Sequence, residues 1–268
     1  MSPRRLGQHF LTDHKLLDRI VEALDVRAGE TVIEVGPGHG SLTEVLLDRG
    51  AQVIAIEKDR ELAEQLRVRV SGVGCQVVTG DALKVDWHEL YSRHLTPDTR
   101  HRLKIVGNIP YYITSPLIDK ALTPPLPDRI VFLVQAEVAD RIAAKPGGKI
   151  YGALSVGVQA VARVEKLFNV AAGAFRPPPR VRSTVIRLTP LVEPLVRPGR
   201  SAGVSGVCHD VLQQAPQAAK KRRAGAERGG SESAGLRSPS APGAPSGRCV
   251  RSALPARGRD TCVAVTYP

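Results

Sequence analysis

Aromatic side chains and long apolar runs are both scarce in this chain of 268 residues. Aromatic residues make up 4% of the sequence, with a single tryptophan. No apolar run approaches the roughly 20 residues that a membrane-spanning helix needs. The basic start, MSPRRLGQHFL, lacks the apolar segment of a signal peptide. These absences exclude a membrane span and lead us to expect a soluble, cytoplasmic protein.

Cysteine is also rare, and its spacing excludes two kinds of site. The four cysteines are Cys75, Cys208, Cys249 and Cys262. None forms a C-x-x-C pair, and three of them lie in the last quarter of the chain. We therefore expect neither a disulfide framework nor a zinc site, and no bound metal.

Acidic residues and large aromatics are depleted at the C-terminal end. Residues 1–193 carry 26 basic and 22 acidic side chains, whereas residues 194–268 carry 12 and 4. The later segment also holds 10 glycines and 8 prolines and has no Phe or Trp, which is typical of a disordered tail. We therefore divide the chain into a folded domain, 1–193, and a Gly/Pro/Arg-rich tail, 194–268. Because two thirds of the net charge of +12 lies in this tail, the charge is weak evidence for an anionic partner.

Strand-like and helix-like patterns alternate along the first part of the chain. Short β-rich runs fall at 31–35, 52–57, 75–83, 103–108 and 131–134, and helical spacing falls at 14–24, 41–50, 59–70 and 136–144. This alternation predicts an α/β fold, a mostly parallel sheet with helices on both faces. The later runs, 161–170 and 180–188, alternate like antiparallel strands that close the edge of the sheet.

A glycine-rich turn follows the first of these strands. The stretch IEVGPGHGSL (33–42) places Gly36, Gly38 and Gly40 between a strand and a helix. Such a turn lets the backbone approach a ligand at the helix N-terminus, although a tight turn without a ligand has the same pattern. The spacing is G-x-G-x-G, not the G-x-G-x-x-G typical of dinucleotide sites.

Acidic residues end the neighbouring strands. Glu57 can accept hydrogen bonds from both hydroxyls of a ribose, and Asp81 can accept one from an adenine amino group. Two ligands fit this arrangement, a nicotinamide dinucleotide and S-adenosylmethionine (AdoMet). Glu34, just before the glycines, either holds the amino-acid end of AdoMet through water or backbone groups or is a surface charge at a strand end.

The stretch NIPYY (108–112) follows the fourth strand and lies at the same edge of the sheet. Two acceptors, the Asn108 side-chain oxygen and the Ile109 carbonyl, can bind the N–H groups of an exocyclic amine and make its nitrogen more nucleophilic. Pro110 stiffens the loop, and Tyr111 offers a ring on which a flipped base can stack. The alternative is that Tyr111 and Tyr112 are simply buried at the sheet edge.

Seven stretches in order resemble one family, the ribosomal RNA small-subunit adenine dimethyltransferases. They are GQHFL (7–11), IEVGPGHGSLT (33–43), Glu57, GDAL (80–83), GNIPYYITSPL (107–117), FLVQAEVADRI (132–142) and AFRPPPRVRSTVIRL (174–188). The resemblance implies a class I (Rossmann-like) enzyme that uses AdoMet to dimethylate N6 of two adjacent adenines near the 3′ end of small-subunit rRNA. It also implies that the partner is the small ribosomal subunit precursor, and we expect a monomer.

The same resemblance implies roles for individual residues. The residues that look like AdoMet contacts are His9, Leu11, Gly36, Glu57, Asp81 and Asn108. Many relatives have Asn where this chain has His9, and a neutral imidazole can make a similar hydrogen bond. Asn108, Ile109, Pro110 and Tyr111 match the target-base motif. Phe175 looks like a second aromatic wall of the adenine pocket, or is a core residue before the proline run. Arg176, Arg180 and Arg182 either meet phosphate or form a solvated basic face.

The tail departs from the family, whose small C-terminal helical domain is missing or replaced here. A one-base shift of the codons for residues 211–222, VLQQAPQAAKKR, permits F-S-S-R-R-R-K-Q-L-R-N. That string resembles the family motif F-x-x-R-R-K-x-L-R-N-x-L of the missing domain. We therefore hypothesise a frameshift around residues 194–204; the alternative is a natural disordered basic tail that binds RNA.

Two other functions remain open at this point. One is a sister enzyme that methylates large-subunit rRNA and confers antibiotic resistance, although the AFRPPPRVRS stretch favours the small-subunit branch. The other is a non-catalytic RNA-binding relative. A pure binding protein has no need of Glu57, Asp81 and Asn108, so we favour an enzyme.

Overall fold

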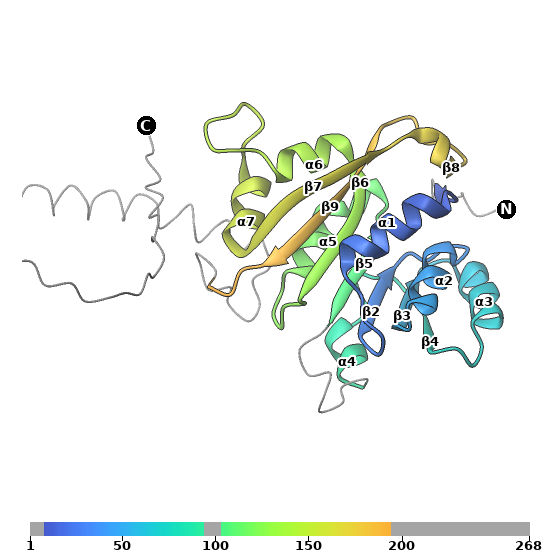
Figure 1. Ribbon diagram of the computed structural model, residues 1–268. Coiled ribbons are helices and arrows are strands. Elements are labelled where there is room, and N and C mark those ends of the chain that lie inside the picture. Colours follow the sequence, from blue (N-terminus) through green and yellow to red (C-terminus); the bar gives the residue numbers. More distant parts are fainter. Residues whose placement is uncertain (1–7, 94–102, 194–268) are drawn as a thin grey trace, which may run out of the picture. The chain divides into compact units, whose positions relative to one another are not determined.

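The computed structural model describes residues 8–93 and 103–193, which form a layered α/β fold (Figure 1). The strands are β1 (Phe10–Leu11), β2 (Thr31–Val35), β3 (Gln52–Glu57), β4 (Cys75–Thr79), β5 (Lys104–Asn108), β6 (Arg129–Gln135), β7 (Ala162–Val170), β8 (Phe175–Arg176) and β9 (Ser183–Pro190). The helices are α1 (His14–Leu24), α2 (Ser41–Asp48), α3 (Arg60–Arg69), α4 (Trp87–Ser92), α5 (Thr114–Ala121), α6 (Ala136–Ile142) and α7 (Ala153–Val161), with short 3₁₀ turns at Tyr111–Ile113 and Ala172–Ala174.

The main sheet has seven strands in the order β4-β3-β2-β5-β6-β9-β7. The strands from β4 to β6 are parallel, β9 runs antiparallel to β6, and β7 runs antiparallel to β9. The chain order reverses between β2 and β5, because β3 and β4 lie on one side of β2 and β5 and β6 lie on the other. Sheets of this kind bind ligands at the carboxyl ends of the strands beside such a reversal.

Helices cover both faces of the sheet, and each face has its own buried core (Figure 1). Leu17 and Leu24 of α1, Leu46 of α2 and Leu66 of α3 pack on one face. The other core takes its side chains from α4, α5, α6 and α7. Side chains of a strand alternate between the two faces of the sheet. In β2, Val32 therefore packs in the first core, whereas Ile33 and Val35 pack in the second.

A second, two-stranded sheet joins the N-terminal end of the described residues to a segment near their C-terminal end. β1 pairs antiparallel with β8, with Phe10 opposite Arg176 and Leu11 opposite Phe175. The segment 8–11, which we call the N-terminal strap, thereby lies near the carboxyl edge of the main sheet. Elements this short have no hydrophobic period, and the sequence did not predict them.

The predicted α/β class with a mostly parallel sheet is confirmed, and most predicted elements lie within a few residues of their expected positions. The predicted strand 75–83 ends at Thr79, and the strand expected from 180 begins at Ser183. Helices α4, α5 and α7 were not predicted. α4 has six residues, Pro116 lies in the first turn of α5, and α7 carries Gly157 and several valines, so each lacks a clear helical signal.

The predicted tail, 194–268, lies outside the described residues, and the division at residue 193 stays a prediction. Within 8–93 and 103–193 no helix has the length and apolar character to cross a bilayer.

Candidate active site

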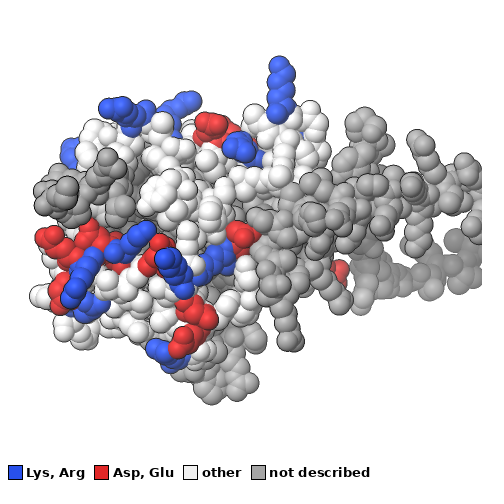
Figure 2. All heavy atoms as spheres, turned by 180° about the vertical axis from the view of Figure 1, so that it is seen from behind, with Lys and Arg blue, Asp and Glu red and all other residues white. Residues whose placement is uncertain are grey.

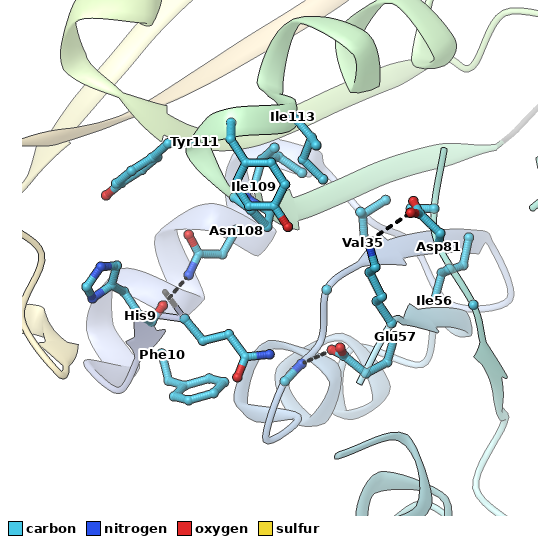
Figure 3. A pocket seen from close by; sticks show the side chains of 18 residues that line it. His9, Phe10, Val35, Ile56, Glu57, Asp81, Asn108, Ile109, Tyr111 and Ile113 are labelled. Carbon is cyan, nitrogen blue, oxygen red and sulfur yellow. Dashed lines mark hydrogen bonds and ion pairs between the residues drawn. The ribbon is translucent and has the colours of Figure 1, made fainter. Parts of the chain in front are cut away.

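A pocket opens at the carboxyl edge of the sheet, where the sequence placed its candidate residues (Figure 3). Its walls are the N-terminal strap, the glycine turn after β2, the ends of β3 and β4, and the loop 108–113 after β5. It contains roughly 850 Å³ of unfilled space, part of which is open to solvent.

The glycine turn is shaped so that side chains are excluded from it. Gly36, Gly38 and Gly40 have φ of +70°, +56° and +85°, a region that residues with a Cβ rarely adopt. A Cβ on Gly38 would lie 2.6 Å from the Phe10 ring of the strap. At its three glycines the turn therefore presents backbone without a side chain near the N-terminus of α2, where a polar ligand can be held closely.

Glu57 lies at the end of β3 with its carboxylate against this turn. Oε2 accepts the Gly38 N–H at 3.0 Å, and Oε1 accepts the Asp59 N–H at 2.8 Å. Burial raises the pKa of Glu57, and these N–H donors offset the effect only in part. Each carboxylate oxygen can accept two hydrogen bonds, so the group retains capacity for two hydroxyl donors.

Asp81 lies just beyond β4 and forms an ion pair with Lys58 across the pocket wall. Lys58 Nζ is 2.9 Å from Asp81 Oδ2, while the Leu83 N–H donates to Oδ1 at 3.0 Å. Lys58 first, and then the Leu83 N–H, hold the pKa of Asp81 below its ordinary value. The carboxylate is thus ionised and available as an acceptor. The sequence analysis did not single out Lys58, which directly follows Glu57.

Glu34 is not the surface charge of one interpretation from sequence, and its role at the amino-acid end of AdoMet stays a prediction. Its side chain is 1% exposed, so it is not a surface charge, and it lies outside the main pocket. It lines a smaller adjoining cavity, where the Thr43 hydroxyl donates to Oε2 at 2.6 Å. Burial raises the pKa of Glu34 to about 7, with a further contribution from the charge of Glu57.

Asn108 ends β5 with its amide held in one orientation. Nδ2 donates to the backbone carbonyl of His9 at 2.7 Å, a contact between residues 99 positions apart (Figure 3). Because a carbonyl can only accept, the NH₂ must face His9 and the oxygen Oδ1 must point the other way. Oδ1 therefore lies on the side of the amide nearer Tyr111, as the acceptor role predicted from sequence requires (Figure 3).

The next three residues of the motif also line the pocket. The Ile109 N–H donates to the Leu133 carbonyl at 3.1 Å, which fixes this peptide against β6. Pro110 precedes a 3₁₀ turn whose first residue is Tyr111. The Tyr111 hydroxyl lies 3.0 Å from Ser183 Oγ, and its ring is only partly buried.

Tyr112 is not buried at the sheet edge, contrary to the alternative drawn from sequence. It is 64% exposed and lines the pocket near Lys58 and Asp81. The 3₁₀ turn at 111–113 points successive side chains in different directions, so adjacent tyrosines do not share one environment.

His9 and Leu11 lie on the strap, but only His9 faces the main pocket. The His9 ring nitrogen Nδ1 donates to the Pro177 carbonyl at 2.8 Å. Leu11 is buried and lines the adjoining cavity with Glu34, Gly36 and Asn108.

Phe175 lines neither of these two cavities, and its role as a pocket wall stays a prediction. The side chain is 1% exposed and packs in the core beneath α1, paired with Leu11 across the β1–β8 ladder. Only one side of the two-residue strand β8 faces the core, and the apolar ring of Phe175 lies on that side. The core interpretation, left open from sequence, describes its position in this structure.

The arginines of the proline-rich segment are all exposed. Arg176 donates to the carbonyls of Gly173 and Phe175, whereas no side-chain contact is described for Arg180 or Arg182. On the face shown in Figure 2, Lys and Arg of the described residues alternate with Asp and Glu and form no continuous basic patch. A phosphate-binding role for these arginines stays a prediction.

The residues at this edge fit AdoMet. The glycines of the turn, the buried Glu57 and the ionised Asp81 line one pocket, as the roles predicted for them from sequence require. Among residues 8–93 and 103–193, no group of three His, Cys, Asp or Glu side chains has a metal-binding arrangement.

Comparisons with known protein sequences identify a family. The profile of the family described as "Ribosomal RNA adenine dimethylase" matches residues 2–201. The ribosomal RNA small subunit methyltransferase A of Hahella chejuensis is 45% identical over 193 residues, which cover 71% of this chain and 68% of that protein. The protein of the same name from Pseudomonas aeruginosa is 43% identical over 194 residues, with 71% and 70% covered.

Two solved structures are similar at 33% sequence identity. A dimethyladenosine transferase from Plasmodium falciparum superimposes with a TM-score of 0.59, covering 68% of this chain and 64% of its own. The 23S rRNA methyltransferase ErmE superimposes with a TM-score of 0.60, covering 70% and 72%. The similarity in structure thus extends to enzymes named for large-subunit rRNA, whereas the two sequence relatives are named for the small subunit.

Proposed function

The chain belongs to the ribosomal RNA adenine dimethylase family, and from this premise we propose that it dimethylates N6 of two adjacent adenines near the 3′ end of small-subunit rRNA. It is an AdoMet-dependent methyltransferase that acts in ribosome biogenesis. Its partner is the small-subunit rRNA or the precursor subunit that contains it. We expect it to work as a monomer in the cytoplasm, where the subunit is assembled.

The observation that carries the proposal is the orientation of the Asn108 amide. Its NH₂ is committed to the His9 carbonyl, so Oδ1 is presented to the pocket as an acceptor. The adjacent Ile109 peptide is fixed by its N–H bond to β6 and gives the second acceptor of the motif. Two acceptors directed at an exocyclic N–H₂ favour a pyramidal nitrogen with a more available lone pair. This is the activation that the weakly nucleophilic N6 of adenine needs.

AdoMet, when bound, supplies the methyl group on its sulfonium. Glu57 binds the ribose hydroxyls, Asp81 binds the adenine amino group, and the glycine turn lies against the rest of the molecule. Leu11 and Gly36 line the adjoining cavity, where we place the amino-acid end. The rate then comes chiefly from holding the two reactants in line, because the proton on N6 can leave after transfer.

Methyl transfer from tritiated AdoMet to undermethylated small ribosomal subunits tests the proposal. We expect label on N6 of adjacent adenines with the parent chain and little label with Asn108→Ala, since the variant lacks the acceptor. His14→Ala is a suitable control, because His14 is exposed on α1 and lines neither cavity.

Large subunits labelled in place of small ones would move the assignment to the ErmE-like activity. AdoMet binding without transfer to either subunit would argue for a non-catalytic relative. A chain with the tail frame restored is assayed in parallel with the parent chain. The comparison distinguishes a wrong substrate assignment from a defective C-terminal region as the cause of low activity.

A further inference from the structure

A lysine of α5 reaches the loop that follows β4. Lys120 Nζ donates to the Leu83 carbonyl at 2.9 Å and to the Val85 carbonyl at 2.5 Å. It also lies 5.3 Å from the centroid of the Trp87 ring, within the range of a cation–π contact. Lys120 lines a separate cavity and not the pocket of the candidate active site. We therefore expect no direct contact between this side chain and a ligand in that pocket.

The backbone of Leu83 connects Lys120 to Asp81. The Leu83 carbonyl accepts from Lys120, while the Leu83 N–H donates to Asp81 Oδ1 at 3.0 Å. The Asp81 carbonyl accepts the N–H groups of Lys84 and Val85, so the chain forms a turn directly after Asp81. Both hydrogen bonds of Lys120 thus hold carbonyls of the turn that carries the Asp81 carboxylate.

The ammonium group that holds this turn is partly withdrawn from water. Burial lowers the pKa of Lys120, and the charges of Asp86 and Asp81 offset this effect in part. A long apolar side chain would fill the same space without the cost of desolvating a charge. It would, however, supply no donor to the two carbonyls, and a partly buried carbonyl that loses its donor is destabilised.

The helix that carries Lys120 is itself firmly packed. Leu117 and Ile118 of α5 are fully buried in the core that α4, α5, α6 and α7 share. Lys120 therefore extends from a fixed backbone to a loop. Functional groups on loops keep their geometry when supporting hydrogen bonds from rigid elements hold them.

We propose that Lys120 is a positioning residue, which holds the loop after β4 so that the Asp81 carboxylate can accept from the adenine amino group of AdoMet. The inference rests on the proposed function and deepens it, because it adds a residue that touches neither reactant. Lys58 acts differently, since it bonds to the carboxylate itself, whereas Lys120 bonds to the backbone. A contact with adenine is equally strong in the ground state and the transition state, so loss of Lys120 should raise KM for AdoMet and leave kcat unchanged.

Three substitutions of Lys120 separate its hydrogen bonds from its bulk. Lys120→Met keeps a long side chain but removes every donor, and Lys120→Arg restores donors on a side chain for which the adjoining cavity has room. Lys120→Gln, a shorter neutral donor, replaces Lys120→Met if that variant does not fold. Lys15→Met is the matched control, because Lys15 is exposed on α1 and lines none of the three cavities.

The first measurement is the rate of methyl transfer to undermethylated small subunits at several AdoMet concentrations. We expect Lys120→Met to raise KM for AdoMet by roughly tenfold, the size of one hydrogen bond to a charged group, with kcat nearly unchanged. Lys120→Arg should recover most of the affinity. A fall in kcat with KM unchanged, which a smaller folded fraction would produce, overturns the inference. So does a Lys120→Met variant with the kinetics of Lys15→Met.

The second measurement needs no RNA and separates this inference from the proposed function. Binding of S-adenosylhomocysteine and of S-inosylhomocysteine to the full chain is measured by calorimetry. The inosine compound has an oxygen in place of the adenine amino group and cannot donate to Asp81. We expect the parent chain to prefer the adenine compound by roughly tenfold and Lys120→Met to lose most of this preference.

The outcomes of this binding experiment distinguish the two failures. Equal weakening of both compounds in Lys120→Met, with the preference intact, overturns the inference, because Lys120 would then support the fold without positioning Asp81. A parent chain without the preference overturns it too. A preference that depends on Lys120, in a chain that transfers no methyl group to small subunits, supports the positioning role and contradicts the proposed activity.

Discussion

A backbone carbonyl orients the Asn108 side chain. The two ends of the amide therefore have separate tasks. Nδ2 is a donor used to fix the side chain, and Oδ1 is an acceptor left for the substrate. A residue that kept the acceptor but lost the donor would retain the chemistry without the orientation. That separation can be made with a single substitution.

Asn108→Asp should therefore be nearly as damaging as removal of the side chain. A carboxylate oxygen would face the His9 carbonyl, which Nδ2 now meets at 2.7 Å, and the two acceptors would repel. A lost hydrogen bond of this kind costs about 1 to 3 kcal/mol, so we expect kcat to fall by roughly tenfold or more. Initial rates of methyl transfer measure it. Asn169→Asp, which retains its acceptor for Thr184 far from the pocket, should leave the rate unchanged.

Glu34 makes a different residue-scale prediction, in which stability depends on pH. Its pKa is raised from 4.5 to about 7 by burial. Between these values the unfolded chain loses this proton while the folded chain keeps it, so stability falls as pH rises from about 4.5 to 7.

Glu34→Gln removes the charge and leaves an oxygen that can accept from Thr43. We expect the variant to gain up to about 3 kcal/mol over the parent above pH 7 and almost nothing at pH 4. Urea unfolding at the two pH values measures the difference. An equal gain in the free energy of unfolding at both pH values would show that the substitution changed the packing and not the ionisation of this position.

At the scale of elements, the site depends on how closely β5 approaches β2. Gly107 lies directly before Asn108 and pairs with Val35, the residue before the glycine turn. A Cβ on Gly107 would lie 2.6 Å from the Val35 carbonyl oxygen and 3.2 Å from its Cβ. The strand that carries Asn108 can thus sit beside the strand that carries the turn only because this position has no side chain.

Gly107→Ala should destabilise the fold and disturb the site together. Overpacking between two central strands costs about 1 to 3 kcal/mol, which the midpoint of urea unfolding measures. Gly173→Ala is the control, because a Cβ there meets no atom within 4 Å and needs no left-handed backbone. A Gly107 variant as stable as this control would contradict the packing argument.

The elements also show what can be predicted from sequence and what cannot. Glu57, Asp81 and Asn108 each end or follow a strand, and parallel strands share a carboxyl edge, so their meeting in one pocket was predictable. The pairing of β1 with β8 was not predictable, because it joins two residues to two others that lie 166 and 164 positions away. The burial of Phe175 and the Lys58–Asp81 ion pair depend on contacts of the same tertiary kind. The sequence therefore predicted the positions of the acceptor side chains but not the tertiary contacts that orient them.

At the scale of the whole molecule, a buried ion pair lies at the edge of the sheet opposite the pocket. Lys104 begins β5, and its Nζ lies 2.6 Å from Glu30 Oε2 just before β2, with both side chains 6% exposed. Lys104 also donates to the Asp25 carbonyl beyond α1. The pair joins β5 to the loop between α1 and β2. It thereby holds together the N-terminal ends of the two central strands, β2 and β5.

Lys104→Met should cost about 3 to 5 kcal/mol, since it removes the ammonium group beside the buried Glu30 carboxylate, which also accepts the Arg27 N–H. Arg49→Met breaks an ion pair with Asp18 whose side chains are 41% and 51% exposed, and should cost less than about 1 kcal/mol. Thermal unfolding of the two variants gives the comparison. Similar midpoints would show that the Lys104–Glu30 pair contributes no more than a surface pair.

The C-terminal segment gives the remaining whole-molecule prediction. If residues 194–268 are translated out of frame, a chain with the frame restored should bind small subunits more tightly than the parent while its AdoMet affinity stays the same. Binding of each chain to small subunits at several salt concentrations measures this. Sequencing of the gene decides the premise: a single intact frame in a second isolate would contradict the frameshift.

The hydrogen-bond partners of His9 and Tyr111 determine when, during synthesis, the pocket can become complete. A nascent chain emerges from its N-terminus and has the glycine turn, both acids and Asn108 by residue 108. The anchor of His9 at Pro177 and that of Tyr111 at Ser183 emerge last. A ribosome that stops before Ser183 therefore releases a chain that has the glycine turn, Glu57, Asp81 and Asn108 but lacks the partner of the Tyr111 hydroxyl.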